Sequence, residues 1–410
     1  MMKKQGAGGQ PLPPQQQQQQ QRPPQPAPAQ AKKPAAIVLS QIPNISSKVL
    51  NLTSIREQSK RELGEALDIL KGGKALVMDP KVIGLLNLIV DPQFLNSHGA
   101  ERNYELKTGK LETNSSNIIY IIRPKIKYMH IIKEHIQRHL DEGLKKTYAI
   151  VYIPRSTILA QRVLEEEGVA GNIEATYELP LDIVPFDEDV LSLELPSAYK
   201  EFLLEGDRTS LFYVAKSLMK LQSMFGTIPL VKGKGQCSRL VMDLITRMRK
   251  EMGEESTVPP EIDSLILIDR DVDLITPMCT QLTYEEEINE TNPTDMAYVY
   301  SGYAPLSCRL VQQAIRPGGW KAIEETLRLL PGPTFEEIQP LPQGATTNVK
   351  SDRKPITLVY FIGGVTFAEI SALRFLSRQD QANRDFIIIT TKLINGDTLV
   401  DNLVEKLEDD

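Results

Sequence analysis

Three short apolar segments, each closed by a proline, constrain the fold of this chain more than any other feature. They are KALVMDP at 74–80, NIIYIIRP at 117–124 and YAIVYIP at 148–154. A strand that is apolar on both sides has to be covered on both faces, as the strands of parallel sheets are. Proline has no backbone N–H donor and ends the strand. Because helical segments separate the three runs, they predict a parallel sheet with helices on both faces.

A second group of apolar strands is predicted far along the chain, at 264–269, 356–362 and 385–390. A second α/β layer is therefore assembled from distant pieces of sequence. Two segments with apolar residues at helical spacing, 210–225 and 238–248, are expected to cover that sheet. A chain of 410 residues with 41% hydrophobic content is long enough for two or three domains. The predicted fold class is α/β, with two parallel-sheet domains.

The N-terminal arm, residues 1–41, has a different composition. Up to about residue 36 it is rich in Pro, Gln, Gly and Ala, and it holds an unbroken glutamine run from Gln15 to Gln21. Such a composition buries too little apolar surface to fold. We therefore expect a disordered arm, and favour a tolerated extension over a docking tail.

Charge and cysteine content exclude several classes of protein. The net charge is −6 and the basic residues are dispersed, so no nucleic-acid partner is expected. No apolar run is long enough to span a bilayer, and the N-terminus lacks the apolar core of a signal peptide. Three cysteines without CxxC spacing fit a reducing cytosol and favour neither disulfides nor a zinc cluster. We expect a soluble, cytoplasmic protein without a metal or other cofactor.

An acidic strand end is the most informative local motif. In LILIDRDVDLITP, at 265–277, a four-residue apolar run leads into Asp269, Asp271 and Asp273, and Pro277 stops the segment. The pattern predicts a buried strand that delivers carboxylates to a sheet edge. Two kinds of protein use such an edge: a phosphate-handling enzyme, and a binding protein in which the aspartates shape a domain junction.

The enzymatic interpretation has specific requirements. In a haloacid dehalogenase-like, Mg²⁺-dependent phosphotransferase, Asp269 attacks phosphorus and Asp271 acts as acid and base. Thr391 and Asp397 imitate the remaining parts, but they are six residues apart and leave the same strand end. That chemistry needs them on separate strands. The phosphotransferase is therefore kept only as the alternative function.

Three further motifs predict ordinary structure. Residues 233–238 (GKGQCS) imitate a phosphate-binding loop but lack its spacer, and we interpret them as a plain turn before a helix. Gly363 and Gly364 are expected to allow close packing between a strand and a helix. His135 and His139 lie four apart without the following glutamate of a zinc protease, and we expect a solvated helix face there.

Several longer stretches carry a family resemblance. They resemble the Sec/Munc (SM) family of SNARE regulators, most closely its vacuolar protein-sorting branch of the thirty-three type. The resemblance extends from about residue 42 to the end of the sequence. It rests on LIDRDVDLITP at 267–277, NPTD at 292–295, YVYSGYAPLS at 298–307, LPGP at 330–333, FIGGVTFAEI at 361–370 and the segment 213–235.

The resemblance implies an arch-shaped fold and a division into domains. Family members have an N-terminal α/β domain, a second α/β domain split in sequence, and a helical third domain inserted into the second. Here QLTYE at 281–285 runs through EEINE at 286–290 directly into TNPTD, so most of the third domain is missing. The implied domains are the disordered arm 1–41, an N-terminal α/β domain 42–180, a split second domain 181–284 and 318–410, and a third-domain remnant 285–317.

The resemblance also implies a non-enzymatic function. It predicts a subunit of HOPS/CORVET-like endolysosomal tethering complexes that binds SNAREs and promotes vesicle docking and membrane fusion. Such a subunit is peripheral on the late endosome, lysosome or vacuole. With a shortened third domain, SNARE templating is expected to be weakened or lost. An alternative is an isoform that occupies the tethering complex without templating SNAREs and so acts as a dominant competitor.

An aromatic cluster in the remnant is the expected docking site for the helical-repeat, sixteen-type subunit of the complex. Aromatic and apolar side chains of this kind favour interface hot spots. The other interpretation is that they pack the remnant onto the second domain. The cluster consists of Tyr298, Tyr300, Tyr303, Pro305 and Leu306. A cleft in the first domain is expected to contact syntaxin-type SNAREs.

Overall fold

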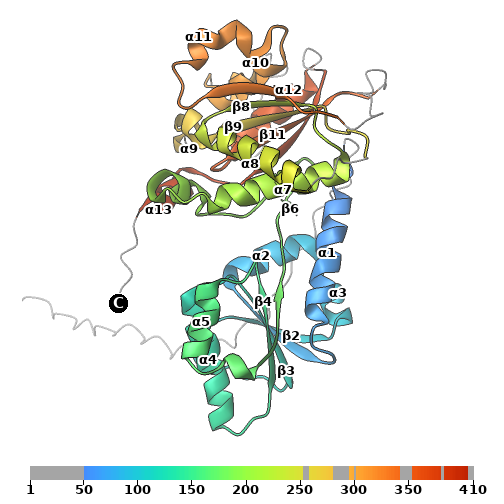
Figure 1. Cartoon of the computed structure of the whole chain (residues 1–410), viewed down its shortest axis with the longest axis vertical. Helices are drawn as coiled ribbons and strands as arrows, with labels where there is room; N and C mark the ends of the chain where they lie inside the picture. The colour runs from blue at the N-terminus through green and yellow to red at the C-terminus, as the bar shows by residue number, and fades with distance from the viewer. Residues whose placement is uncertain are drawn as a thin grey trace, which may run out of the picture. The chain divides into compact units, whose positions relative to one another are not determined.

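The computed structural model of the chain describes residues 50–252, 258–279, 295–299, 302–341, 353–379 and 383–404 (Figure 1). These residues form two β-sheets with helices on their faces, which confirms the predicted α/β class. No helix in the described ranges is both long and apolar enough to cross a membrane. The arm 1–41 lies outside the described residues.

The first sheet has five parallel strands in the order β2-β1-β3-β4-β5. The three strands predicted from sequence are its centre: β1 (Lys74–Met78), β3 (Asn117–Ile122) and β4 (Thr147–Tyr152). The prediction missed the edge strands β2 (Ala100–Glu105) and β5 (Ile173–Glu178). Both edge strands carry exposed polar residues, so neither gives a continuous apolar signal.

The prolines that end the strands also start helices. Asp79 follows β1, and its carboxylate accepts a hydrogen bond from the Lys81 backbone N–H, which caps the helix that begins at Pro80. Proline suits this first helical position because its missing N–H has no partner there. The helices of this region are α1 (Thr53–Leu67), α2 (Pro80–Ile89), α3 (Pro92–Ser97), α4 (Ile126–Asp141), α5 (Ile158–Glu166) and the 3-10 helix η1 (Ala170–Asn172).

The expectation that the α4 histidines lie on a solvated face is wrong for two of them. His135 and His139 are buried, and their Nδ1 atoms lie 3.3 and 2.9 Å from the hydroxyls of Tyr120 and Tyr148. Each Nε2 lies within hydrogen-bond distance of a backbone carbonyl between β2 and β3. Burial lowers the pKa of His135. The partners come from distant segments, so helical spacing alone could not reveal them.

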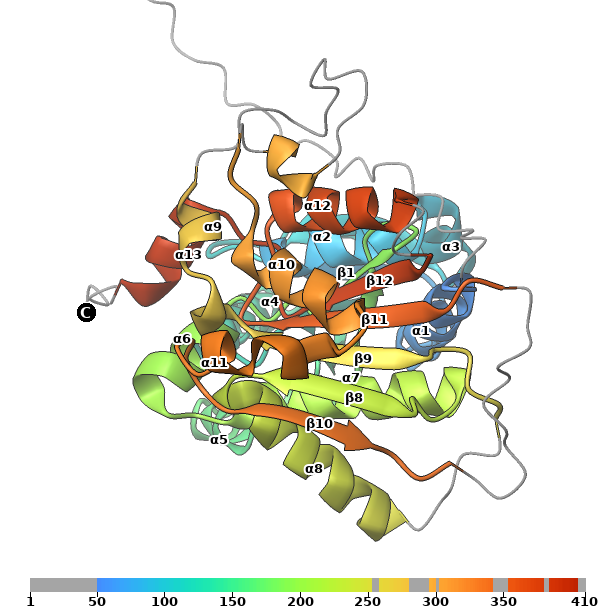
Figure 2. The same cartoon turned by 90° about the horizontal axis from the view of Figure 1, so that it is seen from above.

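The second sheet has seven strands in the order β10-β8-β9-β11-β12-β7-β6, and Figure 2 shows the first five of these side by side. The strands β9 (Ser264–Asp269), β11 (Ile356–Ile362) and β12 (Asp385–Thr390) have the predicted bounds. The two end strands are antiparallel to their neighbours, and the inner five are parallel. The strands that the sequence did not predict are β6 (Val184–Pro185), β7 (Val190–Ser192), β8 (Leu230–Lys234) and β10 (Thr334–Ile338).

The interpretation of residues 233–238 as a plain turn needs correction. Gly233 and Lys234 end strand β8, and a helix starts two residues later at Gln236. Lys234 is buried, and its ammonium donates to the carbonyls of Leu330 and Gly332 at 3.0 and 2.6 Å. Carbonyl oxygens from a distant loop thus make a lysine compatible with an inner strand.

Helices cover both faces of the second sheet. On one face, α7 (Thr209–Phe225) and α8 (Gln236–Met252) pack against Leu265, Leu267 and their neighbours, which confirms the predicted cover. On the other face, α10 (Leu306–Ile315) and α12 (Phe367–Arg378) pack against alternate residues such as Ile266. Shorter helices complete this region: α6 (Ala198–Lys200), η2 (Glu201–Glu205), η3 (Arg270–Val272), α9 (Ile275–Met278), η4 (Met296–Val299), η5 (Gly319–Ile323), α11 (Glu324–Leu327) and α13 (Gly396–Leu403).

Two segments pack across the implied domain bounds. Leu50, Leu52 and Ile55, at the start of the first domain, join the apolar cluster between the second sheet and α7 and α8. Met296, in the implied third-domain remnant, joins the cluster beneath α10 and α12. The second sheet therefore packs against residues from the implied first domain and from the implied third-domain remnant.

Candidate functional site

The first aspartate of the acidic strand end caps a helix. Asp269, at the end of β9, is buried and accepts hydrogen bonds from the backbone N–H groups of Cys237 and Ser238 at 2.6 and 2.8 Å. The Ser238 hydroxyl donates a third bond at 2.5 Å. Gly235 has φ +124°, and a Cβ there would lie 2.0 Å from the Asp269 carboxyl carbon. Glycine is needed because the carboxylate approaches the backbone this closely.

This arrangement bears on two interpretations from the sequence: a phosphate-binding loop at 233–238 and a phosphotransferase that uses Asp269. The N-terminus of α8 is the kind of place where backbone N–H groups bind an anion. Here the anion is the carboxyl group of Asp269 itself, so no room remains for a phosphate. Burial raises the pKa of Asp269 to about 6, although the three hydrogen bonds oppose that shift. A carboxyl that is buried and held in this way is not an accessible nucleophile, which counts against the alternative phosphotransferase.

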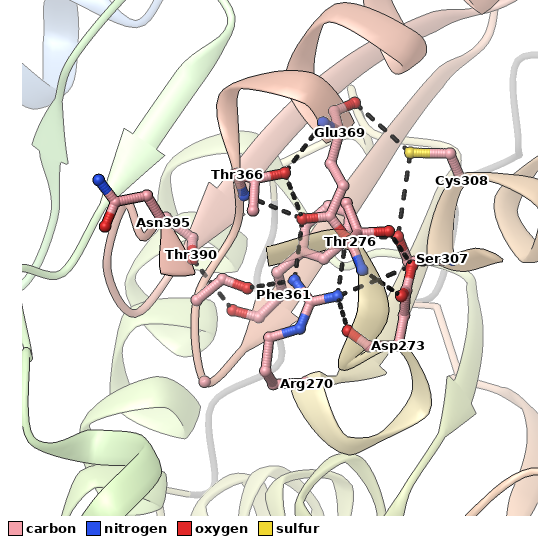
Figure 3. Close-up of polar contacts among 12 residues, drawn as sticks. Arg270, Asp273, Thr276, Ser307, Cys308, Phe361, Thr366, Glu369, Thr390 and Asn395 are labelled. Atoms are coloured by element: carbon pink, nitrogen blue, oxygen red, sulfur yellow. Dashed lines mark hydrogen bonds and ion pairs between the residues drawn. The ribbon is translucent and has the colours of Figure 1, made fainter. Parts of the chain in front are cut away.

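The next residue forms a buried ion pair. Arg270 is 2% exposed, and its guanidinium donates to both carboxylate oxygens of Glu369, at 2.8 and 2.9 Å (Figure 3). It also donates to the Gly364 carbonyl at 3.1 Å and to the Asp273 carbonyl. Burial opposes the charge of Arg270, but the Glu369 carboxylate keeps its pKa raised. Such two-pronged pairing is the strong form of the arginine–carboxylate contact.

Glu369 also starts the following helix. Thr366 and Glu369 form a capping box at the N-terminus of α12: each side chain bonds the other residue's backbone N–H, at 3.2 and 2.9 Å. The Ser307 hydroxyl, from the N-terminus of α10, donates to the same carboxylate (Figure 3). One carboxylate thereby joins the β9 strand end, α10 and α12.

The third aspartate ties down the short helix α9. Asp273 is buried and accepts from the N–H and the hydroxyl of Thr276, at 3.0 and 2.6 Å, and from the Ser307 N–H at 3.2 Å. The Tyr303 hydroxyl lies 3.0 Å from the Thr276 hydroxyl. Because Thr276 already donates to Asp273, Tyr303 donates to Thr276. Burial disfavours a charged Asp273, but these hydrogen bonds outweigh it and lower its pKa.

Together these contacts form what we call the junction network: Arg270, Asp273, Thr276, Ser307, Thr366 and Glu369. Gly363 belongs to its frame, because a Cβ there would lie 2.7 Å from the Arg270 Cβ, at φ +103°. This confirms the predicted close packing at the glycine pair. The network brings together the segments 267–277, 298–307 and 361–370, which are far apart in sequence. Its arrangement is that of a structural junction, and among the described residues no acidic, histidine or cysteine group is arranged to hold a metal.

The structure places only part of the predicted docking cluster. Pro305 is buried, and Tyr303 and Leu306 are half-buried. The Tyr303 hydroxyl is directed to Thr276, in the junction network. The side chain of Tyr298 and the whole of Tyr300 lie outside the described residues. The described members thus anchor this segment to the second sheet, and their role in docking stays a prediction.

A cleft lies at the carboxyl ends of the strands of the first sheet. It has a volume of about 400 Å³ and is lined by Lys81, Arg123 and Pro154, which follow β1, β3 and β4. Tyr213 and Glu201 from the second region complete its wall. In an open parallel sheet, ligands bind outside the carboxyl ends, where the strand order reverses. Here that reversal falls between β1 and β3.

An ion pair supports this cleft. Arg123 donates to the Asp79 carboxylate at 2.6 and 3.2 Å, and the Tyr128 hydroxyl donates to it at 2.9 Å. Burial opposes ionisation of Asp79, but these bonds and the helix-capping bond lower its pKa. Lys81 is exposed, and its ammonium makes no ion pair with a described residue. The cleft lining carries charges of both signs, because Asp182, Glu194 and Glu201 also belong to it. Asp182 and Glu194 pair with Lys216 and Lys392.

Sequence reasoning found the aspartates but not their partners. Ser307 and Glu369 stood in the stretches that carry the family resemblance, without an assigned role. A signal for Glu369 was present: Thr366 and Glu369 have the spacing of a capping box before an apolar helix. No sequence signal connects Ser307 to Glu369, because their contact depends on how α10 crosses the sheet.

Comparison with known proteins identifies a family. The model of the Sec1 family matches residues 74–285 and 285–402, two pieces that meet at one point of the sequence. The vacuolar protein sorting-associated protein 33A of Rattus norvegicus is 29% identical over 587 aligned positions, which cover 87% of this chain and 98% of the relative. The vacuolar protein-sorting-associated protein 33 homolog of Arabidopsis thaliana is 27% identical over 595 positions, which cover 90% of this chain and 100% of the relative.

The length of these alignments shows that a segment is missing. Both aligned spans exceed the 410 residues of this chain, so each relative has many positions without a counterpart here. We place them at residue 285, where the two matched pieces meet. A solved structure with the same fold is that of Sly1p in complex with an N-terminal peptide of Sed5p. It has a TM-score of 0.50 and 11% identity and covers 85% of this chain and 98% of that one.

Proposed function

Because the chain belongs to the Sec1 family, whose members regulate SNARE-mediated fusion without catalysis, we propose that it is an SM-type subunit of an endolysosomal tethering complex of the HOPS/CORVET kind. In this role it binds SNARE proteins and promotes vesicle docking and membrane fusion. It reaches the late endosome, lysosome or vacuole as a peripheral subunit. The observation that carries the proposal is the match to vacuolar sorting relatives over nearly their whole length.

The partner within the complex is the helical-repeat, sixteen-type subunit. It docks on the segment 298–306, whose described part is fixed to the second sheet by the junction network. Tyr303 bonds to Thr276, and Ser307 bonds to Glu369. A segment held in this way loses little conformational freedom on binding, which favours affinity.

The cleft at the first sheet is the proposed contact for a syntaxin-type SNARE. Its apolar wall includes Leu85, Ile153 and Leu195, and its rim carries the exposed ammonium of Lys81. A helical segment with an apolar stripe and acidic flanks fits this combination. The exposed ammonium of Lys81 also favours encounter with an acidic residue of that segment.

In the shortened chain, two activities of an SM protein, SNARE templating and docking on the tethering complex, are expected to be separated. Holding several SNARE helices in register needs the helical insertion that the family resemblance implies. The relatives have additional positions where this chain passes residue 285, and we assign the insertion to them. Docking on the tethering complex needs only the second sheet and the segment that it holds. The second candidate function is therefore a competitor that occupies the subunit position without templating SNAREs.

Calorimetric titration of the purified chain with the helical-repeat region of the sixteen-type subunit tests the proposal. We expect micromolar or tighter binding, weakened at least tenfold by Tyr300→Asp and by Leu306→Asp. The matched control is Ile338→Asp, which changes an exposed apolar residue on β10. Absence of binding by the folded wild-type chain contradicts the proposal. Binding without stimulation of fusion in a SNARE liposome assay favours the competitor.

A further inference from the structure

Two short helices present an exposed apolar surface to solvent. In α9 and the residue before it, Leu274, Ile275 and Met278 are 45, 66 and 59% exposed. In and just after α13, Val400 and Val404 are also exposed. We call these five residues the α9–α13 patch. Single exposed apolar residues need no explanation, but a group on two adjoining helices marks an interaction surface.

The five residues are continuous in space. α9 and α13 contact each other. Gly396, the first residue of α13, packs against Met278: a Cβ on Gly396 would lie 3.8 Å from the Met278 sulfur. Val400 and Val404 follow Gly396 at intervals of four residues, which places them on one side of the helix. The stripe that starts at Met278 therefore continues along α13.

The patch is held rigidly from beneath. Thr276 lies between Ile275 and Met278, and its side chain is buried in the junction network. On α13, Leu399, the residue before Val400, is buried and packs with Tyr199 and Ile394. An apolar surface that is already ordered pays little entropy when a partner covers it. It differs in this respect from the exposed apolar residues of a mobile loop.

The border of the patch on α13 is acidic. Asp397 and Asp401 are exposed and lie one position after Gly396 and Val400 on the helix. The described residues provide no ion pair to either carboxylate. Lys392, the described cation just before α13, is bound to Glu194. The surface therefore combines an apolar centre with uncompensated negative charge on one side.

The patch lies close in sequence to the point where the two matched pieces of the family meet. The two matched pieces of the family meet at residue 285, seven positions after Met278, and the relatives hold additional positions there. In the relatives, extra chain therefore leaves the second sheet beside this surface. We propose that the α9–α13 patch is a docking site for an amphipathic helix with an apolar stripe and Lys or Arg flanks, supplied by a separate polypeptide. This inference does not depend on the tethering or SNARE-binding role.

Fluorescence anisotropy with two designed peptides tests the proposal on the full chain. Each labelled peptide has about 18 residues, five helical turns, with leucines on one face. One carries lysine on the other face, and its partner carries glutamate. We expect the leucine–lysine peptide to bind at least tenfold more tightly than the leucine–glutamate peptide and than a scrambled leucine–lysine sequence. The double variant Ile275→Lys with Met278→Lys is expected to reduce binding at least tenfold.

Matched variants distinguish specific binding at the α9–α13 patch from non-specific peptide binding. Ile338→Lys and Leu329→Lys place the same charge on residues that are 82 and 84% exposed elsewhere, and both should leave peptide binding unchanged. Asp397→Lys with Asp401→Lys should reverse the preference between the two peptides. Equal binding of the scrambled peptide, or unchanged binding by the Ile275 and Met278 variant, overturns the proposal. Concentration-dependent dimers in sedimentation that this variant abolishes also overturn it, because a second copy is then the occupant.

Discussion

The ends of β1 and β9 use the same local device for opposite purposes. Each strand ends in an aspartate that caps a helix, Asp79 for α2 and Asp269 for α8. An arginine forms an ion pair beside each of them. Arg123 pairs with Asp79 itself, and Arg270, the residue after Asp269, pairs with Glu369. In the first sheet, Arg123 remains partly exposed and lines the cleft. In the second sheet, Arg270 is sealed beneath α10 and α12. The first sheet edge leaves an open cleft, which we propose serves recognition, and the second holds distant segments together.

This difference shows why a motif does not by itself define a site. Three aspartates after an apolar strand satisfy the sequence pattern of a phosphotransferase. What decides their role is where their oxygens find donors. For Asp269 and Asp273 the donors are the N-terminus of α8 and the side chain of Thr276, all inside the protein. A buried carboxylate that is satisfied internally stabilises a junction and leaves nothing for a substrate.

The substitution with the largest expected effect on stability breaks the buried ion pair between Arg270 and Glu369. Arg270→Leu leaves the Glu369 carboxylate buried without its main cation, and we expect the free energy of unfolding to fall by about 3–5 kcal/mol. The control is Arg328→Leu, which breaks an exposed pair with Glu324 and should cost less than about 1 kcal/mol. Urea denaturation followed by circular dichroism measures both. Equal losses for the two variants would remove the distinction between sealed and exposed pairs.

The next effect is a dependence of stability on pH. Burial raises the pKa of Asp269 to about 6 in the folded protein, from 3.8. The folded state then holds this proton more tightly than the unfolded chain, so the contribution is present below about pH 4 and lost as pH rises through 6. We expect the stability advantage of the wild type over Asp269→Asn to shrink by roughly 3 kcal/mol across that window.

Denaturation curves at several pH values between 4 and 7 measure this advantage. Taking the difference from Asp269→Asn removes the contributions of His135, Asp79 and Asp273, which titrate in both proteins. This prediction is contradicted if the stability advantage of the wild type over Asp269→Asn grows as pH rises. The hydrogen-bond donors at the start of α8 would then favour the ionised Asp269 carboxylate more strongly than burial disfavours it. Asp269 would then resemble Asp79 in its protonation.

A smaller effect is expected where the backbone approaches Asp269. Gly235→Ala places a Cβ against the Asp269 carboxyl group at a positive φ, and we expect a loss of about 2 kcal/mol. Gly171→Ala is the matched control, since nothing lies within 4 Å of the position that its added methyl group would take, and it should change stability by less than about 0.5 kcal/mol. Thermal unfolding of both variants is the measurement. A Gly235→Ala variant as stable as wild type would show that the helix cap is not tight.

Local signals predicted the centre of each sheet well. The strands β9, β11 and β12 are continuous apolar runs, and their bounds follow from the sequence. β8 gave no such signal because it contains Lys232 and Lys234, whose ammonium groups reach carbonyls far along the chain. The edge strands β2 and β10 are polar on one side and resemble loops.

The junction shows the limit of such reasoning more clearly. Periodicity and turn chemistry describe one segment at a time, and they located the strand end and the glycine pair. The contact of Ser307 with Glu369, or of His139 with Tyr148, depends on which helix crosses which strand. The family resemblance pointed to the right segments, yet it did not state that their side chains meet in one network.

Titration of a syntaxin-type SNARE cytosolic domain against matched variants of the two sheet edges tests the central claim most directly. Lys81→Glu should weaken binding at least tenfold without changing the Tm, because Lys81 is exposed at the cleft. Ser307→Ala should lower the Tm by a few degrees and leave binding unchanged, because it removes one buried hydrogen bond worth about 1 kcal/mol. The opposite pattern, with binding lost in Ser307→Ala and kept in Lys81→Glu, would contradict the assignment of recognition to the first sheet.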